Sequence, residues 1–513
     1  MATRQIVSKS IPKVASGDYI GKDGELWVDT VTNTMKISDG VTAGGATLTT
    51  DGGAGAVTYA AITNINNANG PEKVAIGRNA GSVNQGTESV AIGDDAGKTD
   101  QSSNSLAIGN NAGTISQGGS SVAIGDVAGS ITQGTLSVAI GANAGTTTQG
   151  DWSVAIGAGA ALTTQGSNSV AIGNEAGETT QGNTATAVGN RAGETDQGED
   201  ASAFGAGAGT TNQGASAVAI GVGAGAATQS DKAIAIGKQA GKTTQGNSAV
   251  AIGELAGETT QGQYTVAIGN LAGNVTQTQY AIAVGNGAGQ TNQGAGGIAI
   301  GMHSGKDDQS GNGIGIGFEA GKTTQSQHGV AIGALAGKTT QGENSVAIGK
   351  QAGQTTQDTK AVAIGVNAGN DTQGTKAIAI GDQAGLTDQS SSAVAVGEQA
   401  GLTTQSQHGV AIGASAGKTT QGESSVAIGK QAGRDNQGSS AVAIGNLAGL
   451  DNQHNNSIVI SASGTALNTA QTGQFLVQPV RNFSNAAALP TGFKQVAYNP
   501  TTGEFVYYGV AGT

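Results

Sequence analysis

The stretch SVAIGDDAGKTDQSSN, Ser89 to Asn104, decides the fold, because the residues that follow it, SLAIGNNAGTISQGGS, repeat it in phase. The same 16-residue unit runs without insertion or deletion from Lys73 to about Ser457, in 24 copies. A fixed short period indicates a stack of supersecondary units, each of which buries its apolar residues only against its neighbours. We therefore predict that most of the chain is one repetitive structure.

The composition excludes several classes of protein. Glycine is 90 of 513 residues and aromatic residues are 3%, which leaves too few large side chains for several thick globular cores. Val and Ile recur at fixed spacing, unlike in disordered tracts, and there is no G-X-Y period of collagen. A net charge of −12 disfavours nucleic acid as a partner. Because cysteine is absent, disulfides and thiolate zinc sites are excluded.

The first residues, MATRQIVSKSIPKVASGDY, lack the apolar core of a secretory signal. No run of about 20 apolar residues occurs that would span a membrane. We therefore expect a protein that is made in the cytoplasm, is not secreted by a signal peptide and does not insert into a membrane.

Each unit predicts two short strands and two turns. With Ser89 as position 1, positions 1 to 5 read small-Val-Ala-Ile-Gly, an alternation typical of a strand. The larger side chains at positions 2 and 4, such as Val90 and Ile92, are predicted to point into the coil, and positions 1 and 3 to point outward. Positions 10 to 13, commonly x-Thr-Thr-Gln, predict a second strand.

Two residues are present in every copy. Position 5 is always glycine, which predicts a positive φ or very close backbone packing, and position 13 is always glutamine, which predicts a ladder of stacked amides. The first of these predicted turn and ladder residues are Gly77, Gly93, Gly109, Gln85, Gln101 and Gln117.

These features predict an all-β parallel β-solenoid of about 24 coils, which at a strand spacing of ~4.8 Å would be about 115 Å long. Position 3 is alanine in every copy except Gly315. If it faces outward, this strip of small residues needs a cover, and identical chains around an axis are the simplest one. The alternative is that alanine merely suits a thin monomeric solenoid. The predicted trimer interface includes Ala75, Ala91, Ala107, Ala123, Ala139, Ala155 and Ala171.

The repeat SVAIG…A… resembles the head repeat of trimeric autotransporter adhesins of the YadA type, over roughly residues 73–460. The resemblance implies a trimeric, left-handed parallel β-roll in an adhesive fibre. The unit here is longer than the usual family unit, and its Thr-Thr-Gln-Gly strand is distinctive. The end segments resemble other proteins: GELWVDTVTNTMKISDGVTAGG (24–45) is similar to N-terminal modules of bacteriophage structural proteins, and FLVQPVR (475–481) is similar to the distal region of phage fibres.

The ends of the chain are predicted to be small β-rich modules. Residues 25–29 and 35–38 alternate polar and apolar around a turn-like TNT, and residues 495–508 read strand, NPTTG turn, strand, so both predict hairpins. The predicted domains are an attachment or capping module (1–50), a Gly/Ala/Asn-rich connector (51–72), the β-roll (73–461) and a tip (462–513). The tip is also expected to set the register of the chains, because near-identical coils permit slippage.

Phe505, Tyr507 and Tyr508 are the candidate contact residues of the tip. They would form either a surface that contacts a receptor, with rings that stack on a glycan, or the apolar core of a trimer. Both interpretations stay open from the sequence.

No pattern in the chain predicts catalysis, a cofactor or a metal site. The four histidines are scattered, the carboxylates show no pairing that singles out an acid and a base, and the calcium-binding GGxGxDx pattern is absent. The recurrent GxxAG opens no βαβ unit, so it is not a dinucleotide site. We expect a protein that is not an enzyme.

The predicted function is that of a structural tail fibre of a phage virion, a stiff trimeric spacer that presents tips to the host surface. Its expected partners are two further copies of itself, other baseplate or tail proteins, and a host receptor or glycan. Two alternatives are a capsule-polysaccharide depolymerase on a solenoid, and a monomeric ice- or surface-binding solenoid built on the threonine rows. Asp307, Asp371 and Asp435 interrupt those rows.

Overall fold

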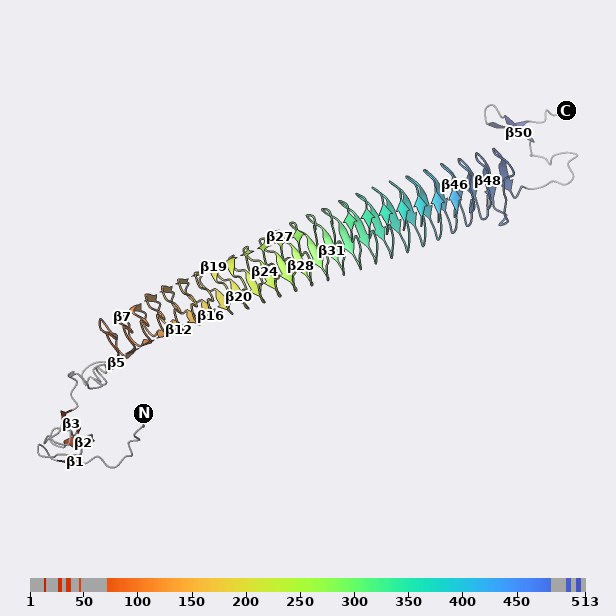
Figure 1. Ribbon diagram of the computed structural model, residues 1–513. Helices are drawn as coiled ribbons and strands as arrows, with labels where there is room; N and C mark the ends of the chain where they lie inside the picture. Colours follow the sequence, from red (N-terminus) through yellow and green to blue (C-terminus); the bar gives the residue numbers. More distant parts are fainter. Residues whose placement is uncertain are drawn as a thin grey trace. The chain divides into compact units, whose positions relative to one another are not determined.

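The computed structural model describes the backbone of residues 13–14, 26–29, 34–37, 46–47, 72–480, 495–499 and 504–508, and the side chains of residues 72–480, Val496 and Phe505. Its regular elements are all β-strands, and the chain is a parallel β-solenoid of about 25 turns with a 16-residue repeat (Figure 1). The described residues contain no helix that could cross a membrane. Contacts divide the chain into two units, Met1–Ala233 and Ile234–Thr513.

In the first unit, each coil contributes one strand to each of two parallel sheets. The first sheet contains the Val-Ala-Ile segments, and the second sheet contains the segments that end in glutamine. The strands of the first sheet are β5 (Lys73–Ile76), β6 (Ser89–Ile92), β8 (Leu106–Ile108), β10 (Val122–Ile124), β12 (Val138–Ile140), β14 (Val154–Ile156), β16 (Val170–Ile172), β18 (Thr186–Val188), β20 (Ser202–Phe204) and β22 (Val218–Ile220). The strands of the second sheet are β7 (Thr99–Gln101), β9 (Ile115–Gln117), β11 (Thr132–Gln133), β13 (Thr148–Gln149), β15 (Thr164–Gln165), β17 (Thr180–Gln181), β19 (Thr195–Gln197), β21 (Thr211–Gln213) and β23 (Thr228–Gln229).

The second unit continues the same two-sheet pattern. Its first sheet contains β24 (Ile234–Ile236), β26 (Val250–Ile252), β28 (Val266–Ile268), β30 (Ile282–Val284), β31 (Ile298–Ile300), β32 (Ile314–Ile316), β34 (Val330–Ile332), β36 (Val346–Ile348), β38 (Val362–Ile364), β40 (Ile378–Ile380), β42 (Val394–Val396), β44 (Val410–Ile412), β46 (Val426–Ile428), β47 (Val442–Ile444), β48 (Ile458–Ser461) and β49 (Phe475–Gln478). Its second sheet contains β25 (Thr244–Gln245), β27 (Thr260–Gln261) and β29 (Thr276–Gln277), and then β33 (Thr324–Gln325), β35 (Thr340–Gln341), β37 (Thr356–Gln357), β39 (Thr372–Gln373), β41 (Asp388–Gln389), β43 (Thr404–Gln405) and β45 (Thr420–Gln421).

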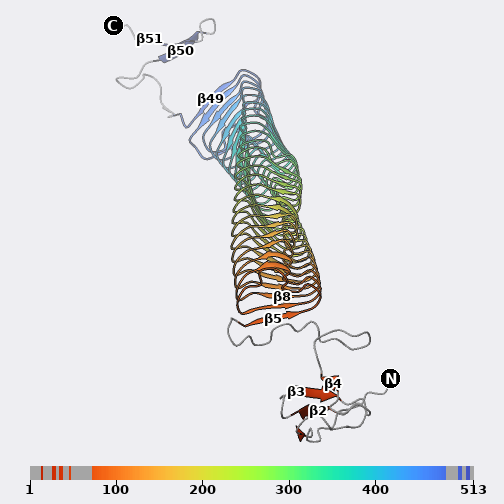
Figure 2. The same ribbon diagram turned by 90° about the vertical axis from the view of Figure 1, so that its left-hand side faces the viewer.

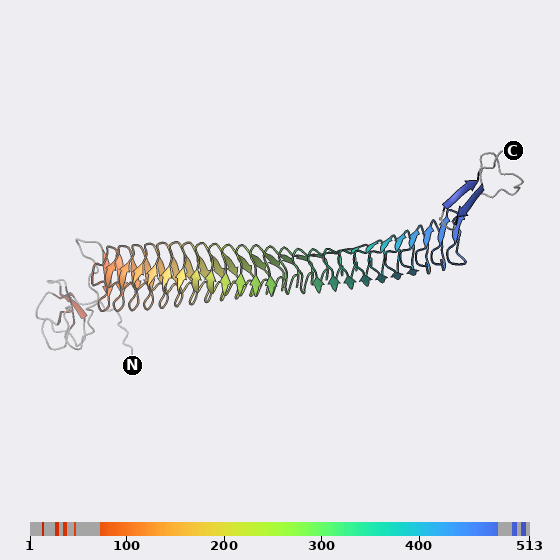
Figure 3. The same ribbon diagram turned by 90° about the horizontal axis from the view of Figure 1, so that it is seen from above.

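The register is that of an uninterrupted repeat. Val122 pairs with Val138 and Ile124 with Ile140, so equivalent residues of successive coils lie on one another, as the stacked coils in Figures 2 and 3 show. The first sheet continues past the last 16-residue copy, because β48 pairs with β49. Between β29 and β33 the second sheet is reduced to isolated bridges between successive glutamines, from Gln277 to Gln325.

Short strands outside the solenoid form the predicted hairpins. Strand β2 (Leu26–Asp29) pairs antiparallel with β3 (Thr34–Ile37), and β50 (Gln495–Asn499) pairs antiparallel with β51 (Glu504–Tyr508). Two further strands, β1 (Lys13–Val14) and β4 (Ala46–Thr47), extend the N-terminal hairpin into a four-stranded sheet. The turns between the paired strands lie outside the described residues.

The predicted direction of the side chains is wrong. Positions 1 and 3 point into the coil, as Ser89 and Ala91 show with relative exposures of 1% and 0%, whereas Val90 and Ile92 are partly exposed. Positions 1 and 3 have no room for larger side chains, because the glutamine of position 13 occupies the rest of the interior. A Cβ placed on Gly97 would lie 3.2 Å from the Ala91 Cβ and 2.6 Å from the Gln101 Oε1.

The glutamine at position 13 fills the remaining interior. Gln101 is buried, and its Nε2 donates across the coil to the Val90 backbone oxygen at 2.9 Å. Gln117 donates to the Leu106 oxygen at 2.8 Å in the same way. Each glutamine thus ties the second sheet to the first within its own coil.

The glutamine ladder is present, although it does not begin where it was predicted. Gln165 Nε2 donates to Gln181 Oε1 at 3.1 Å, and within the second unit every glutamine from Gln245 to Gln437 donates to the next one. The backbones of Gln101 and Gln117 are paired, but their Oε1 atoms have no hydrogen-bond partner. Gln85 bonds the Val74 oxygen at 2.9 Å.

The prediction for the position-5 glycines is confirmed on both counts. Gly77 has a φ of 130°, and a Cβ there would lie 2.3 Å from the carbonyl oxygen of Gly93. Gly93 and Gly109 have φ values of 136° and 133° and the same close approach to the next coil. A side chain at this turn would therefore separate the coils.

Two departures from the alanine pattern compensate for each other. Ser304 stands where other coils have alanine at position 8, and its hydroxyl donates to the Ala320 oxygen at 3.2 Å. Gly315 replaces the position-3 alanine of the next coil, where a Cβ would lie 2.7 Å from that hydroxyl. The hydroxyl of Ser304 occupies the space that the methyl group would need.

Candidate self-association surface

The outer surface of the first sheet is apolar along its length. Because side chains alternate across a strand and positions 1 and 3 turn inward, positions 2 and 4 face out. We call these side chains, from Val74 to Ile444, the Val/Ile face, and treat it separately in each unit. After Lys73, no charged residue occupies positions 1 to 4 of any coil. Thr186 and Ser202 are the polar residues on the face.

The side chains of the Val/Ile face are only partly covered within the chain. Position 2 is half-buried in every coil, and position 4 is partly exposed in every coil, with relative exposures of 36–40% in eleven coils between Ile172 and Ile444. Ile412, Ile428 and Ile444 show relative exposures of 39%, 38% and 38%. Each of these side chains is thus covered only in part by its own chain.

A bare apolar face is unusual for a parallel sheet, which is generally covered on both sides. Burying an aliphatic side chain completely is worth roughly 2 kcal/mol, at about 25 cal/mol per Å² of apolar surface removed from water. A side chain that is one third exposed therefore still has on the order of 30 Å² of apolar surface to bury. The eight position-4 isoleucines of the second unit with exposures of 36–39% offer roughly 250 Å² on this scale, and the partly exposed side chains beside them add to that area. A continuous apolar patch of a few hundred Å² marks an interaction site on a soluble protein.

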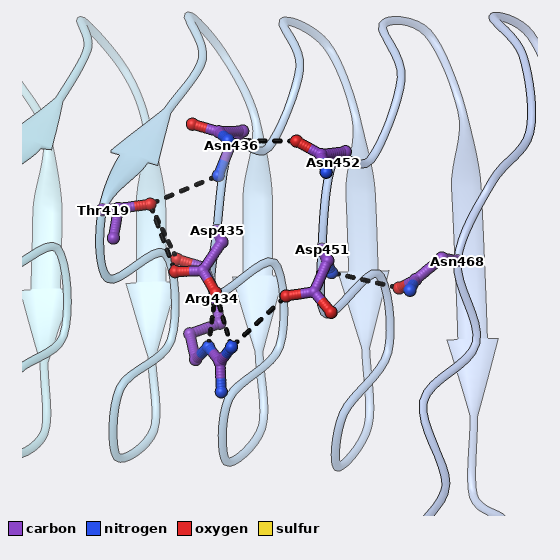
Figure 4. A network of polar contacts seen from close by, with 7 residues as sticks. All are labelled: Thr419, Arg434, Asp435, Asn436, Asp451, Asn452 and Asn468. Atoms are coloured by element: carbon purple, nitrogen blue, oxygen red, sulfur yellow. Dashed lines mark hydrogen bonds and ion pairs between the residues drawn. The ribbon is translucent and has the colours of Figure 1, made fainter.

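The second sheet presents the opposite chemistry. Its outward residues are mostly threonine, asparagine and aspartate, and Figure 4 shows how they interact near the C-terminal coils. The Arg434 Nη2 lies 2.6 Å from Asp435 Oδ2 and 3.3 Å from Asp451 Oδ1, and hydrogen bonding to Asp435 raises the pKa of Arg434. Asn436 donates to Asn452 at 3.0 Å. These polar side chains are therefore paired with one another on the surface of the second sheet.

Three glutamates approach one another on an outer turn of the first unit. Carboxylate oxygens of Glu175, Glu178 and Glu194 lie within 4.8 Å of one another, with the Arg191 guanidinium 2.7 Å from Glu194 and 3.4 Å from Glu175. Burial raises the pKa of Glu178, and the charges of the other two glutamates raise it further. Arg191 already neutralises part of the cluster, which needs no ion to explain it.

The predicted trimer-interface residues do not lie on the surface. Ala91, Ala107, Ala123, Ala139, Ala155 and Ala171 have no exposed surface, and Ala75 in the first coil is 7% exposed. An alanine buried inside its own coil does not touch another chain, so this assignment is corrected: the surface that needs a cover is the Val/Ile face. The invariant glutamine was the sequence feature that could have indicated the correct side-chain direction. A side chain of that length inside the coil leaves room only for small groups such as methyl beside it.

The tip residues are placed only in part. Phe505 lies on β51, is 56% exposed, and has its ring centroid 5.7 Å from that of Phe475. Tyr507 and Tyr508 lie on the same strand, but their side chains are outside the described residues. Their role in the tip stays a prediction.

Comparisons with known proteins identify no relative. No protein-family model, no curated protein and no solved structure matches the chain.

Proposed function

We propose that this chain is a structural, non-catalytic fibre protein that associates with two further copies of itself through the Val/Ile face. The observation that carries the proposal is the outward aliphatic ladder of the first sheet, which has no charge on a chain of net charge −12. Burial of this ladder would remove apolar surface from water without desolvating a charged group.

A second copy fits this face better than an unrelated partner does. The face repeats every 16 residues along the chain at the strand spacing, and another copy offers the same repeat at the same spacing. Closed symmetric assemblies are the common result when one surface binds itself. Three copies would each turn the Val/Ile face towards a common axis and the polar second sheet towards water.

The fibre role adds a biological setting to this assembly. The likeness of the repeat to adhesin heads, and of the end segments to phage fibre modules, supports a tail fibre in a phage virion. One end module would attach to baseplate or tail proteins, and the tips would contact a host receptor or glycan. Three tips on one stiff spacer would bind the host surface together, so that weak individual contacts would give a high overall avidity.

The oligomeric state tests the proposal directly. Native mass spectrometry of the full chain should give three times the 49.5 kDa chain mass. Ile252→Glu places a charge on the Val/Ile face and should shift the mass towards one chain, whereas Thr260→Glu, on the exposed second sheet of the same coil, should leave the trimer intact. A monomeric wild-type chain, or equal effects of the two variants, would contradict self-association through this face.

The virion setting needs its own test. Antibodies against the chain, with immunogold labelling of intact phage particles, should mark fibres on the particle. Gold on cells or on free protein alone would contradict this part and leave the trimer unaffected.

A further inference from the structure

Coils 185–216 interrupt the uniformity of the Val/Ile face. In these two coils position 2 is Thr186 and then Ser202, and position 4 is Val188 and then Phe204. Elsewhere position 2 is Val, Leu or Ile and position 4 is Ile or Val. Two adjacent coils therefore combine the smallest position-2 side chain of the repeat with the largest position-4 side chain.

The four residues are neighbours in the first sheet. Strands β18 and β20 are paired, with Thr186 beside Ser202 and Val188 beside Phe204, and β22 follows with Val218 and Ile220. Phe204 is 40% exposed, so much of its ring projects from the chain. Within one chain, the small side chains of Thr186 and Ser202 therefore lie on the same face as a projecting ring.

The side chains of the two coils compensate in part for one another in size. Ser202 is smaller than the usual valine and Val188 is smaller than the usual isoleucine, which offsets part of the extra volume of the phenyl ring. Packing within the chain explains only part of this compensation, because 40% of Phe204 stays exposed beyond its paired neighbours Val188 and Ile220. The compensation matters where another surface packs against the face, because close-packed interfaces tolerate neither overlap nor voids.

We infer that Ser202 and Phe204, with Thr186, form a register key between copies of this chain, an inference that rests on the proposed self-association. When copies align at the same height, the ring of Phe204 on one copy packs over the small side chains of the next. If one copy slips by a coil, a Phe204 ring meets Val218 and Ile220 instead, where the volume is already filled. The other coils are nearly equivalent, so they discriminate poorly against slippage.

The key removes a weakness that the repeat itself creates. A slip by one coil would cost only the contacts of the coils left overhanging, which is a small share of a long interface. Slipped chains would also leave parts of the Val/Ile face uncovered at both ends, and these invite further association. A mismatch inside the interface penalises every slipped alignment, independently of the end modules.

Pulsed electron paramagnetic resonance on the assembled full chain tests the inference. The chain has no cysteine, so Thr340→Cys, on the exposed face of β35, accepts a single spin label per copy. Aligned copies should give one narrow interspin distance. Ser202→Val with Phe204→Ile, which makes the face uniform, should broaden this peak towards longer distances, because slips of several coils at ~4.8 Å per coil move the labels apart along the stack.

Two control variants separate register from affinity. Val330→Ile, a conservative change on the same face, should leave the narrow peak unchanged. Moving the key to another coil, with Val250→Ser and Ile252→Phe added to the uniform variant, should restore the narrow peak. Circular dichroism and native mass spectrometry should show the same fold and mass for all variants.

The outcomes that overturn the inference are distinct. A wild-type chain with no dipolar coupling would refute the proposed self-association, and the key with it. A uniform variant that stays narrow would refute the key alone and would assign register to the end modules. A uniform variant that dissociates would also refute it, because the residues would then provide affinity rather than alignment.

Discussion

The two sheets to which each coil contributes are built from neighbouring residues, yet they direct opposite kinds of side chain inward and outward. The first sheet directs alanine inward and Val and Ile outward, whereas the second directs its longest side chain, glutamine, inward and short polar residues outward. A familiar hydrophobic core is therefore missing, and the interior is closed by a polar cross-link. The comparison teaches that in a thin coil the size of a side chain decides whether it points inward. The hydrophobicity of the outward side chains then decides whether that surface faces water or a partner.

Overpacking the interior should have the largest effect. Ala251→Val adds two carbons where Ala251 is fully buried, and should destabilise the chain by about 3 kcal/mol, because neither sheet is free to move away. Val250→Ile, one residue away on the outer side, adds volume without such a constraint. Urea denaturation followed by circular dichroism measures both variants. Similar losses for the two would contradict the assigned side-chain directions.

Removing a cross-link should be the next largest effect. Gln261→Leu keeps the approximate length of the side chain but loses the hydrogen bonds to the Val250 oxygen at 2.8 Å and to Gln277 at 3.3 Å. Unpaired buried groups then remain, at a cost of about 2 kcal/mol. The exposed Thr260→Val is the matched change on the outer side of the same strand. A fully stable leucine variant would show that the interior needs filling rather than hydrogen bonding.

The compensating pair Ser304 and Gly315 allows a sharper test of interior space. Gly315→Ala should cost roughly 1–3 kcal/mol, because its methyl group would overlap the Ser304 hydroxyl. Adding Ser304→Ala should recover most of that loss. A double-mutant cycle from urea midpoints gives the coupling energy, and additive effects would show that the two residues are independent.

The smallest effect is expected on the outer turns. The raised pKa of Glu178 means that its charged form is disfavoured in the folded chain, so its contribution to stability is greatest below the unfolded pKa and declines as pH rises through the folded one. Glu178→Gln should therefore stabilise the chain at neutral pH, by about 0.5 kcal/mol or less, and make no difference in acid. Thermal midpoints at several pH values measure this, and a gain confined to low pH would reverse the sign.

The sequence was sufficient for the architecture and insufficient for the orientation of its side chains. An exact period, invariant Gly77 and its equivalents, and Gln85 and its equivalents predict stacked coils of two strands, and the structure confirms them. The alternation of Val90, Ala91 and Ile92 is equally consistent with either face pointing inward. The cross-section of the coil resolves that ambiguity, and it depends on contacts between two strands that local pattern does not contain.

The site was affected by the same ambiguity. The sequence indicated that one outward row of side chains on the first strand needs a cover. Because Val and Ile were predicted to point inward, the alanines were predicted to form that outward row. With the direction reversed, the need for a cover becomes stronger, since the bare row is aliphatic rather than small. The departure at Ser202 and Phe204 was visible in the sequence, but it had no meaning until that row was known to face outward.

The glutamine ladder gives the second unit an electrical polarity. Successive peptide groups within a strand point in opposite directions across the sheet and largely cancel one another, but every side-chain amide from Gln245 to Gln437 points its N–H towards the next coil. These aligned amide dipoles sum in the way peptide dipoles sum along a helix. One end of the column, near Gln453, is thereby made partially positive and the other partially negative, so molecules that dock at the two ends of the stack would meet fields of opposite sign.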